Sequence, residues 1–283
     1  MNKKFFELDF FALLEKVVNK EAFSFTRFSD GEMFMLKDQS LSLQGDHVQI
    51  NGKVHGNRYT VEDFKDFDPV KHKKSYDLLR DSFDYSDPTY FKGICCKCCQ
   101  GEENFKWMTE GTGTGPFTWS NLFVNSNYRL FLNYMIPALR ERDVYLIHHT
   151  SAKLDNLPFP IKKSFTVSNN AFTEDQEVID EIKTYIDTNQ IHDAVFLFAC
   201  STLANLAIHS LHEENKDNTY IDVGSTLNPF IGLGITRGYL RGAFYNELNS
   251  SPLNQGILNE SQQASFQVGQ HNPLDINKVC IWD

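Results

Sequence analysis

The sequence predicts an α/β protein with a mostly parallel sheet that is covered by helices on both faces. In the second half of the chain, short apolar segments alternate with stretches of helical periodicity, as in strands joined by crossover helices. These segments are nearly continuously apolar, which is typical of parallel strands buried on both faces. With 283 residues, 41% of them hydrophobic, the chain suits one domain over residues 1–283.

The first half of the chain contains fewer regular elements. Residues 22–28 alternate and are rich in aromatic side chains, which indicates a strand. Residues 38–68 are polar, and Asn51-Gly52 within them is a strong signal for a hairpin turn. Glycines punctuate residues 110–119, which favours a loop. The other predicted elements here are helices over 5–20, 32–37, 69–84 and 121–139 and a strand over 91–96.

The second half is more regular. Thr173 and Gln176 match a capping box at the start of a helix over 173–187. Residues 249–277 are polar and irregular, so we expect them to wrap the surface or form a lid, and 278–283 are a candidate for a last strand. The remaining predicted elements are strands over 143–149, 164–167, 193–200 and 218–224 and a helix over 201–214.

The charge and cysteine content exclude several classes of protein. A net charge of -10 argues against a general nucleic-acid binder, although one nucleotide could still bind. No apolar run approaches the length of a transmembrane helix. Four of the six cysteines crowd into residues 95–99, unlike a disulfide framework, so we expect a reducing, cytoplasmic compartment. The oligomeric state stays open.

Two acidic residues follow the first predicted strand. Asp30 and Glu32 are one residue apart on a turn, where both carboxylates could bind Mn²⁺ or Mg²⁺ together with a substrate phosphate. Arg27 could pair with the same phosphate through its planar guanidinium. The alternative is an ordinary solvated turn, since Ser-Asp-Gly is common in turns.

The segment RFSDGE, residues 27–32, resembles the Arg-Phe-Gly-Asp-Gly-Glu motif of the glycosyltransferases with the GT-D type fold. The resemblance implies that Asp30 and Glu32 bind the metal and take part in catalysis. It also implies that Arg27 and Gly31 belong to the segment that binds the nucleotide-sugar diphosphate. Ser29 departs from the motif, because it replaces a glycine.

The resemblance continues in order along residues 22–235. It includes Asn170-Ala171-Phe172 and the strand end YIDVG at 220–224. It implies a Rossmann-like fold and transfer of a hexose from a nucleotide sugar, with UDP as the expected nucleotide, to a carbohydrate or glycoprotein acceptor. Cys200-Ser201-Thr202 and Ser225-Thr226-Leu227 differ from the family pattern, which leaves the donor sugar and the acceptor undetermined.

A second group of polar residues falls at the ends of later strands. Ser201 and Thr202 lie where a strand meets a helix, so they could bind a phosphate or simply cap the helix. Asp222 ends the next strand, where it could act as a base, bind a sugar hydroxyl, or cap a helix. The family match favours a catalytic role for Asp222.

Three other motifs carry weaker signals. Residues 95–99 contain two overlapping C-x-x-C pairs, but a zinc site needs further ligands, which His148, His149 or Cys200 could supply. We favour two strand residues and two loop residues there. The histidines could also supply a base or fill a structural role. Residues 111–115 could be a phosphate loop or a linker.

The competing function is a non-catalytic nucleotide- or zinc-binding α/β protein in an assembly.

Overall fold

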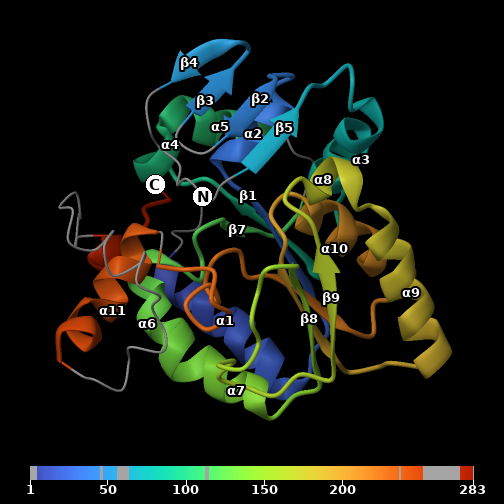
Figure 1. The fold of residues 1–283 in the computed structure, drawn as a ribbon, viewed down its shortest axis with the longest axis vertical. Helices are drawn as coiled ribbons and strands as arrows, with labels where there is room; N and C mark the ends of the chain where they lie inside the picture. The colour runs from blue at the N-terminus through green and yellow to red at the C-terminus, as the bar shows by residue number, and fades with distance from the viewer. Residues whose placement is uncertain are drawn as a thin grey trace.

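The computed structural model describes residues 5–44, 47–55, 64–111, 115–235, 237–250 and 275–282. Within them, seven strands form one sheet in the order β7-β6-β1-β11-β10-β8-β9, and every neighbouring pair is parallel (Figure 1). The predicted α/β class is therefore confirmed. The strands are β1 Ser24–Phe28, β6 Tyr90–Ile94, β7 Phe117–Trp119, β8 Val144–His149, β9 Lys163–Val167, β10 Val195–Ala199 and β11 Thr219–Asp222.

Helices cover both faces of this sheet. The α-helices are α1 Phe6–Asn19, α2 Asp30–Leu36, α3 Lys73–Asp84, α4 Lys97–Gln100, α5 Glu102–Gly111, α6 Tyr128–Leu130, α7 Ile136–Arg140, α8 Ala171–Glu174, α9 Glu177–Asn189, α10 Leu203–Glu214 and α11 Gly238–Ser250. Shorter helical turns are η1 Asn125–Asn127, the π-helical η2 Phe131–Met135 and η4 Asp275–Asn277.

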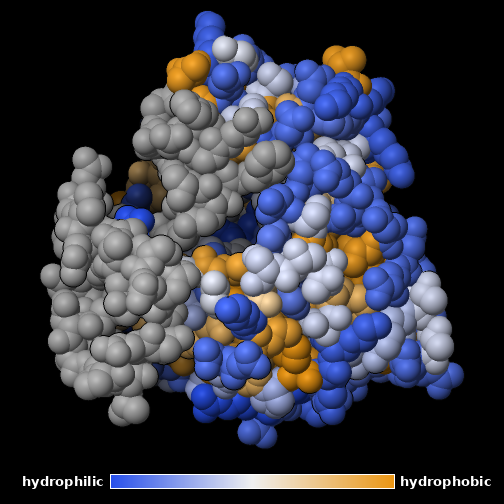
Figure 2. All heavy atoms as spheres, in the orientation of Figure 1, coloured by the Kyte–Doolittle hydropathy of each residue, from blue (hydrophilic) through white to orange (hydrophobic). Residues whose placement is uncertain are grey.

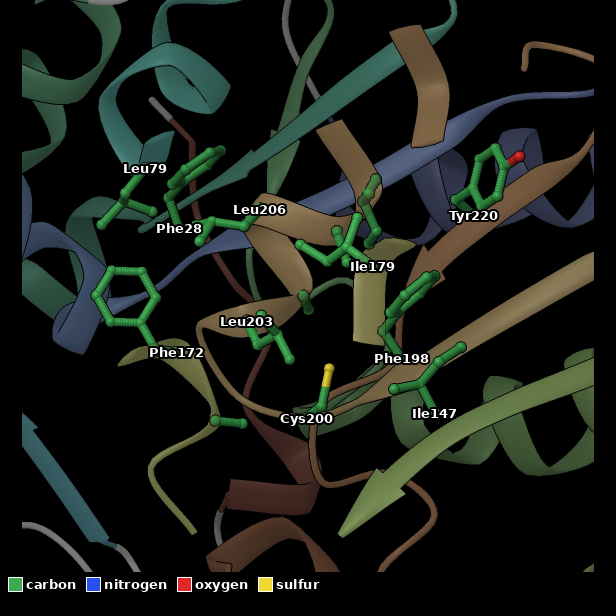
Figure 3. Packing of buried hydrophobic residues seen from close by; sticks show 14 of the residues in the cluster. Phe28, Leu79, Ile147, Phe172, Ile179, Phe198, Cys200, Leu203, Leu206 and Tyr220 are labelled. Atoms are coloured by element: carbon green, nitrogen blue, oxygen red, sulfur yellow. The ribbon is translucent and has the colours of Figure 1, made fainter. Parts of the chain in front are cut away.

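The strand side chains divide the core into two clusters, one on each face of the sheet. In β10, Val195 and Leu197 pack into one cluster, and Phe196 and Phe198 pack into the other. Helices α1, α7 and α11 contribute to the first cluster, whereas α3, α9 and α10 contribute to the second. Figure 3 shows part of the second cluster, where residues from β1, β10 and α10 meet. A sheet buried on both faces explains why these strands are nearly continuously apolar.

The strand order changes direction beside β1. The chain runs from β1 outward to β6 and β7, and then returns through β8, β9 and β10 to place β11 on the other side of β1. The loops that leave the carboxyl ends of β1 and β11 therefore diverge. In open α/β sheets this divergence opens a crevice that binds ligands.

The polar segment 38–68 forms more structure than the sequence predicted. Four antiparallel strands pair in the order β4-β3-β2-β5, namely β2 Leu41–Gln44, β3 His47–Ile50, β4 Lys53–His55 and β5 Phe64–Phe67. The predicted hairpin is confirmed, because Asn51 and Gly52 join β3 to β4 with positive φ angles. Leu41 and Leu43 pack into the main core, which anchors this small sheet although its sequence is polar overall.

Three predicted helices begin later than expected, and one of them is α3, which was expected from residue 69 and begins at Lys73. The helix expected from residue 173 begins at Glu177, and the Thr173 hydroxyl donates to the Asn170 carbonyl instead of capping it. The helix expected from residue 121 starts as a 3-10 turn at Asn125 and contains one π-helical segment. Around residue 173, local hydrogen bonds between Asn170 and Thr173 compete with a regular helix start.

Other differences lie near loops. Residues 117–119, predicted as loop, form β7 at the edge of the sheet, and residues 278–282 form no strand. Most of the predicted surface segment 249–277, and residues 112–114 of the glycine-rich loop, lie outside the described residues. Every described helix is too short or too polar to cross a lipid bilayer. The face in Figure 2 is largely hydrophilic, in keeping with the net charge of -10.

Candidate active site

The turn after β1 holds the predicted Asp-Gly-Glu segment. Ser29 is the N-cap of α2, and its backbone N–H donates to Oε2 of Glu32 at 3.1 Å, which closes a capping box. Asp30 is half-buried, and its Oδ1 accepts the Gly31 N–H at 3.0 Å. The helix thus begins at Asp30, and its first turn fixes both carboxylates at the edge of the sheet.

Glu32 is buried and already has cationic and hydroxyl partners. Its Oε1 accepts hydrogen bonds from Lys65 Nζ at 3.0 Å and from the Thr202 hydroxyl at 2.5 Å. Burial acts to raise the pKa of Glu32, but the Lys65 charge and these hydrogen bonds outweigh it, so that the pKa falls below its usual value. Glu32 is therefore ionised at neutral pH.

Arg27 lies between the ends of three strands. Its Nε donates to the Ser120 carbonyl at 2.5 Å, and its Nη1 lies 3.8 Å from Oδ1 of Asp222. Gly224 has a φ of +52°, and a Cβ there would lie 1.8 Å from the Arg27 guanidinium. Only glycine at 224 therefore allows the guanidinium to occupy this position.

Asp222 ends β11 beside this arginine. Burial raises the pKa of the Asp222 carboxyl to about 6, against the opposing effects of Arg27 and of the Gly224 N–H, which donates to its Oδ1 at 2.8 Å. The Glu32 charge nearby adds to the rise. A carboxyl group that titrates near neutral pH is suited to exchange a proton with a substrate.

Ser201 and Thr202, which the sequence grouped together, face different surroundings. Ser201 is exposed with a φ of +56°, whereas Thr202 is fully buried and directs its hydroxyl to Glu32. Thr202 is the N-cap residue of α10 but makes no side-chain cap hydrogen bond. One turn later, Asn205 Nδ2 donates to the Arg27 carbonyl at 2.8 Å, which ties α10 to β1.

Sequence reasoning missed Lys65, which β5 brings to the site from the small antiparallel sheet. Lys65 Nζ contacts both Glu32 and Thr202. Asn170 holds the neighbouring backbone, because its Oδ1 accepts the Asp66 N–H at 3.2 Å. The alternation of FKDF at 64–67 was the only available signal, and it indicates a strand without identifying its partners.

The histidines and the cysteine cluster have other environments. The His148 ring bonds the His149 carbonyl at 2.9 Å, and the His149 ring bonds the Ser151 hydroxyl at 2.6 Å. Cys95 and Cys96 follow β6 directly, but Cys98 and Cys99 belong to helix α4 and not to a loop as predicted.

Comparisons with known proteins bear on the fold. No protein-family model and no curated protein matches the sequence. A solved structure described as the domain of unknown function 1792 with a distinct glycosyltransferase fold matches with a TM-score of 0.50 and 14% identity, over 76% of both chains. A selenomethionine structure of domain of unknown function 1792 matches with a TM-score of 0.51 and 16% identity, over 77% of both chains. The protein has the DUF1792 fold.

A third DUF1792 structure, described as a new glycosyltransferase from Streptococcus sanguinis, matches with a TM-score of 0.49 and 15% identity, over 77% of this chain and 80% of that one. The DUF1792 fold confirms the architecture that the motif resemblance implied, with helices on both faces of a parallel sheet. Within this fold, Arg27, Glu32, Thr202 and Asp222 meet where the strand order changes direction.

Proposed function

We propose that this protein is a glycosyltransferase that uses a nucleotide-sugar donor. The observation that carries the proposal is the meeting of Arg27, Glu32 and Asp222 at the carboxyl edge of β1 and β11, in a chain with the DUF1792 fold. A matching structure of this fold is described as having a distinct glycosyltransferase fold. A fold alone does not determine function, and the charged groups at this edge are what make the assignment chemically specific.

The charged residues divide into two roles in this proposal. Arg27 and Lys65 provide positive charge for the diphosphate of the donor, and the exposed Ser201 extends this binding surface. Asp222, with a pKa of about 6, is the base that accepts the proton of the acceptor hydroxyl as it attacks the anomeric carbon. Asp30 lies beside this region at the start of α2.

The proposed Mn²⁺ or Mg²⁺ would be held by Asp30 and Glu32. Carboxylate oxygens fit either ion, and a bound ion would neutralise charge on the leaving diphosphate. However, Oε1 of Glu32 already accepts from Lys65 and Thr202. A cation would therefore have to use Asp30 together with Oε2 of Glu32, which accepts the Ser29 N–H. Lys65 supplies part of the positive charge that a metal would otherwise provide.

The finer assignments rest on the motif resemblance. A UDP-hexose donor and a carbohydrate or glycoprotein acceptor follow from the Arg27–Glu32 segment and its successors. A cytoplasmic location is part of the proposal, because none of the six cysteines forms a disulfide, which suits a reducing compartment.

Ligand-dependent melting tests the proposal. At a hundredfold excess over Kd, UDP should stabilise the protein by about 2.7 kcal/mol when Mn²⁺ or Mg²⁺ is present, and much less in chelator. Equal melting shifts with and without metal would remove the metal from the mechanism and leave Arg27 and Lys65 as the diphosphate ligands. Absence of any shift with all nucleoside diphosphates, and of any hydrolysis of nucleotide sugars, would support the non-catalytic alternative instead.

A further inference from the structure

Four cysteines from two segments that are distant in sequence converge beside the main sheet. The Sγ atoms of Cys96, Cys98, Cys99 and Cys280 all lie within 4.8 Å of one another. Cys96 precedes α4, Cys98 and Cys99 lie within α4, and Cys280 follows η4. The sequence offers His148, His149 or Cys200 as further ligands, whereas the fold brings Cys280 to the other three cysteines.

Cys95 and Cys96 are neighbours in the sequence, but only Cys96 belongs to the group of four sulfurs. Cys95 packs into the core on one face of the sheet, and its thiol donates to the Phe28 carbonyl at 3.4 Å. Cys96 packs into the cluster on the opposite face, toward Cys280. Extended backbone points successive side chains to opposite faces, so that the pair is divided between the two sides.

We propose that Cys96, Cys98, Cys99 and Cys280 form a tetrathiolate site for a structural Zn²⁺ ion. Structural zinc is bound by four tetrahedral ligands, and cysteine thiolate is a preferred one. With Zn–S bonds of about 2.3 Å, a regular tetrahedron places its sulfurs about 3.8 Å apart. The Cys96–Cys98 and Cys98–Cys99 Sγ pairs lie 3.0 Å and 4.0 Å apart, on either side of this value.

The surroundings suit a cluster of thiolates. The side-chain amide of Asn121 donates to Cys99 Sγ at 3.4 Å, and that of Asn125 donates to Cys280 Sγ at 3.5 Å. Lys278 interacts with the Cys99 thiol and brings a positive charge to the group. Hydrogen bonds to ligand atoms orient them and reduce the excess negative charge of four thiolates around a divalent ion.

A disulfide explains the cluster less well. A disulfide would join two sulfurs at about 2.05 Å, whereas the sulfurs of Cys96 and Cys98 lie 3.0 Å apart and all four sulfurs approach one another here. Cys280 lies outside any helix or strand, yet it is buried with its sulfur against the other three. A shared ion gives a reason for all four positions.

The site would fasten the end of the chain to the body of the protein. Around Cys280, the Ser126 N–H donates to the Lys278 carbonyl at 3.1 Å, and Trp282 packs edge-on against Trp119 at 5.0 Å. Cys96 lies just beyond the end of β6, the strand that neighbours β1. A metal bridge between these segments would therefore support the sheet beside the candidate active site without touching it.

Metal analysis of the full chain, purified without an affinity tag or chelator, tests this site. We expect about one zinc per chain. Replacing zinc by Co²⁺ should give the thiolate-to-cobalt charge-transfer absorption of a tetrahedral site, and Cys280→Ser should lose stoichiometric zinc. The matched control is Cys95→Ala, which removes a buried cysteine from the same segment and should keep the zinc.

Three results would overturn the proposal. The first is less than a tenth of an equivalent of zinc in a wild-type protein whose four thiols react freely in the native state. The second is a disulfide between any two of the four cysteines. The third is full zinc retention in Cys280→Ser. If Cys280→Ser fails to fold, the cobalt spectrum of the wild-type chain still decides the question, because absorption without thiolate charge transfer contradicts the ligand set. The result is independent of the Asp30 and Glu32 site, which binds no thiolate.

Discussion

Glu32 combines a structural and a chemical role at the residue scale. It closes the capping box of α2, and it also neutralises Lys65 and accepts the Thr202 hydroxyl. Replacing it would therefore remove a helix cap and leave a half-buried ammonium without its partner. For this reason the effect of a Glu32 variant on activity cannot be separated from its effect on stability, and Asp30 is the better position to test.

Asp30→Asn should abolish glycosyl transfer and leave the fold intact. Asp30 is only half-buried, so that its replacement by an amide of the same shape should change the free energy of unfolding by less than about 0.5 kcal/mol. Activity with a nucleotide sugar and thermal melting measure the two effects. Asp77→Asn, in an exposed ion pair on α3, is the control and should keep full activity. Wild-type turnover by Asp30→Asn would exclude this carboxylate from the mechanism.

Asp222→Asn should stabilise the protein at neutral pH and impair transfer. Because the folded-state pKa is about 6 and the ordinary pKa of an aspartate is 3.8, folding favours the protonated carboxyl, and this contribution is lost as the pH rises from about 4 to about 6. Ionised Asp222 therefore costs about 3 kcal/mol at pH 7. Denaturant unfolding should show the variant more stable at pH 7, with the difference vanishing below pH 4.

The activity of the same variant gives an independent result. Wild-type turnover should rise with pH through about 6 as Asp222 ionises. The variant should not show this rise, and its rate should be lower by a factor of about 10² to 10⁴. A variant with an unchanged pH profile would show that another group serves as the base. If the variant is less stable than the wild type at pH 7, the buried charge of Asp222 does not destabilise the folded protein.

At the scale of elements, the loop after β11 decides where Arg27 lies. Gly224→Ala adds a Cβ at 1.8 Å from the Arg27 guanidinium and also strains a backbone with positive φ. We expect Arg27 to shift and transfer to fall by at least about tenfold, which corresponds to about 1.4 kcal/mol of lost transition-state binding. Steady-state kinetics with the nucleotide sugar measure this loss.

Gly52→Ala separates backbone strain from the steric effect. Gly52 also has a positive φ, of +70°, but no atom lies within 4 Å of a Cβ placed there. Backbone strain should lower the free energy of unfolding of this variant by about 1 kcal/mol, and the variant should keep its activity. Equal activity of the two alanine variants would show that the position of Arg27 does not matter for transfer.

At the scale of the whole molecule, the two sheets should differ in local stability. β1, β10 and β11 lie at the centre of the parallel sheet with apolar clusters on both faces, whereas the tip of the β3–β4 hairpin is exposed at Asn51 and Val54. Native-state hydrogen exchange should therefore be slowest in the three central strands and fastest in the hairpin. Faster exchange in β10 than in β3 would contradict this order.

Sequence patterns determined most of the main sheet. Six of its strands were predicted because buried parallel strands are continuously apolar or, in β1, alternating and aromatic, and these are local properties of the chain. β7 was missed because an edge strand of three residues after a glycine-rich segment carries too little pattern. The predicted start of α9 was wrong because the Thr173 hydroxyl forms hydrogen bonds with Asn170 instead of capping the helix.

The candidate site divides in the same way. The sequence by itself pointed to Arg27, Asp30, Glu32 and Asp222 as candidate site residues, because each lies at or just after the end of a predictable strand and the carboxyl ends of parallel strands share one edge. Only the tertiary structure placed Lys65 against Glu32 and Cys280 against the other three cysteines. Both contacts join segments that are distant in sequence, and their geometry depends on how separate elements pack rather than on any local periodicity. Local pattern thus determined the strands and their ends, whereas packing decided which charges and thiols meet.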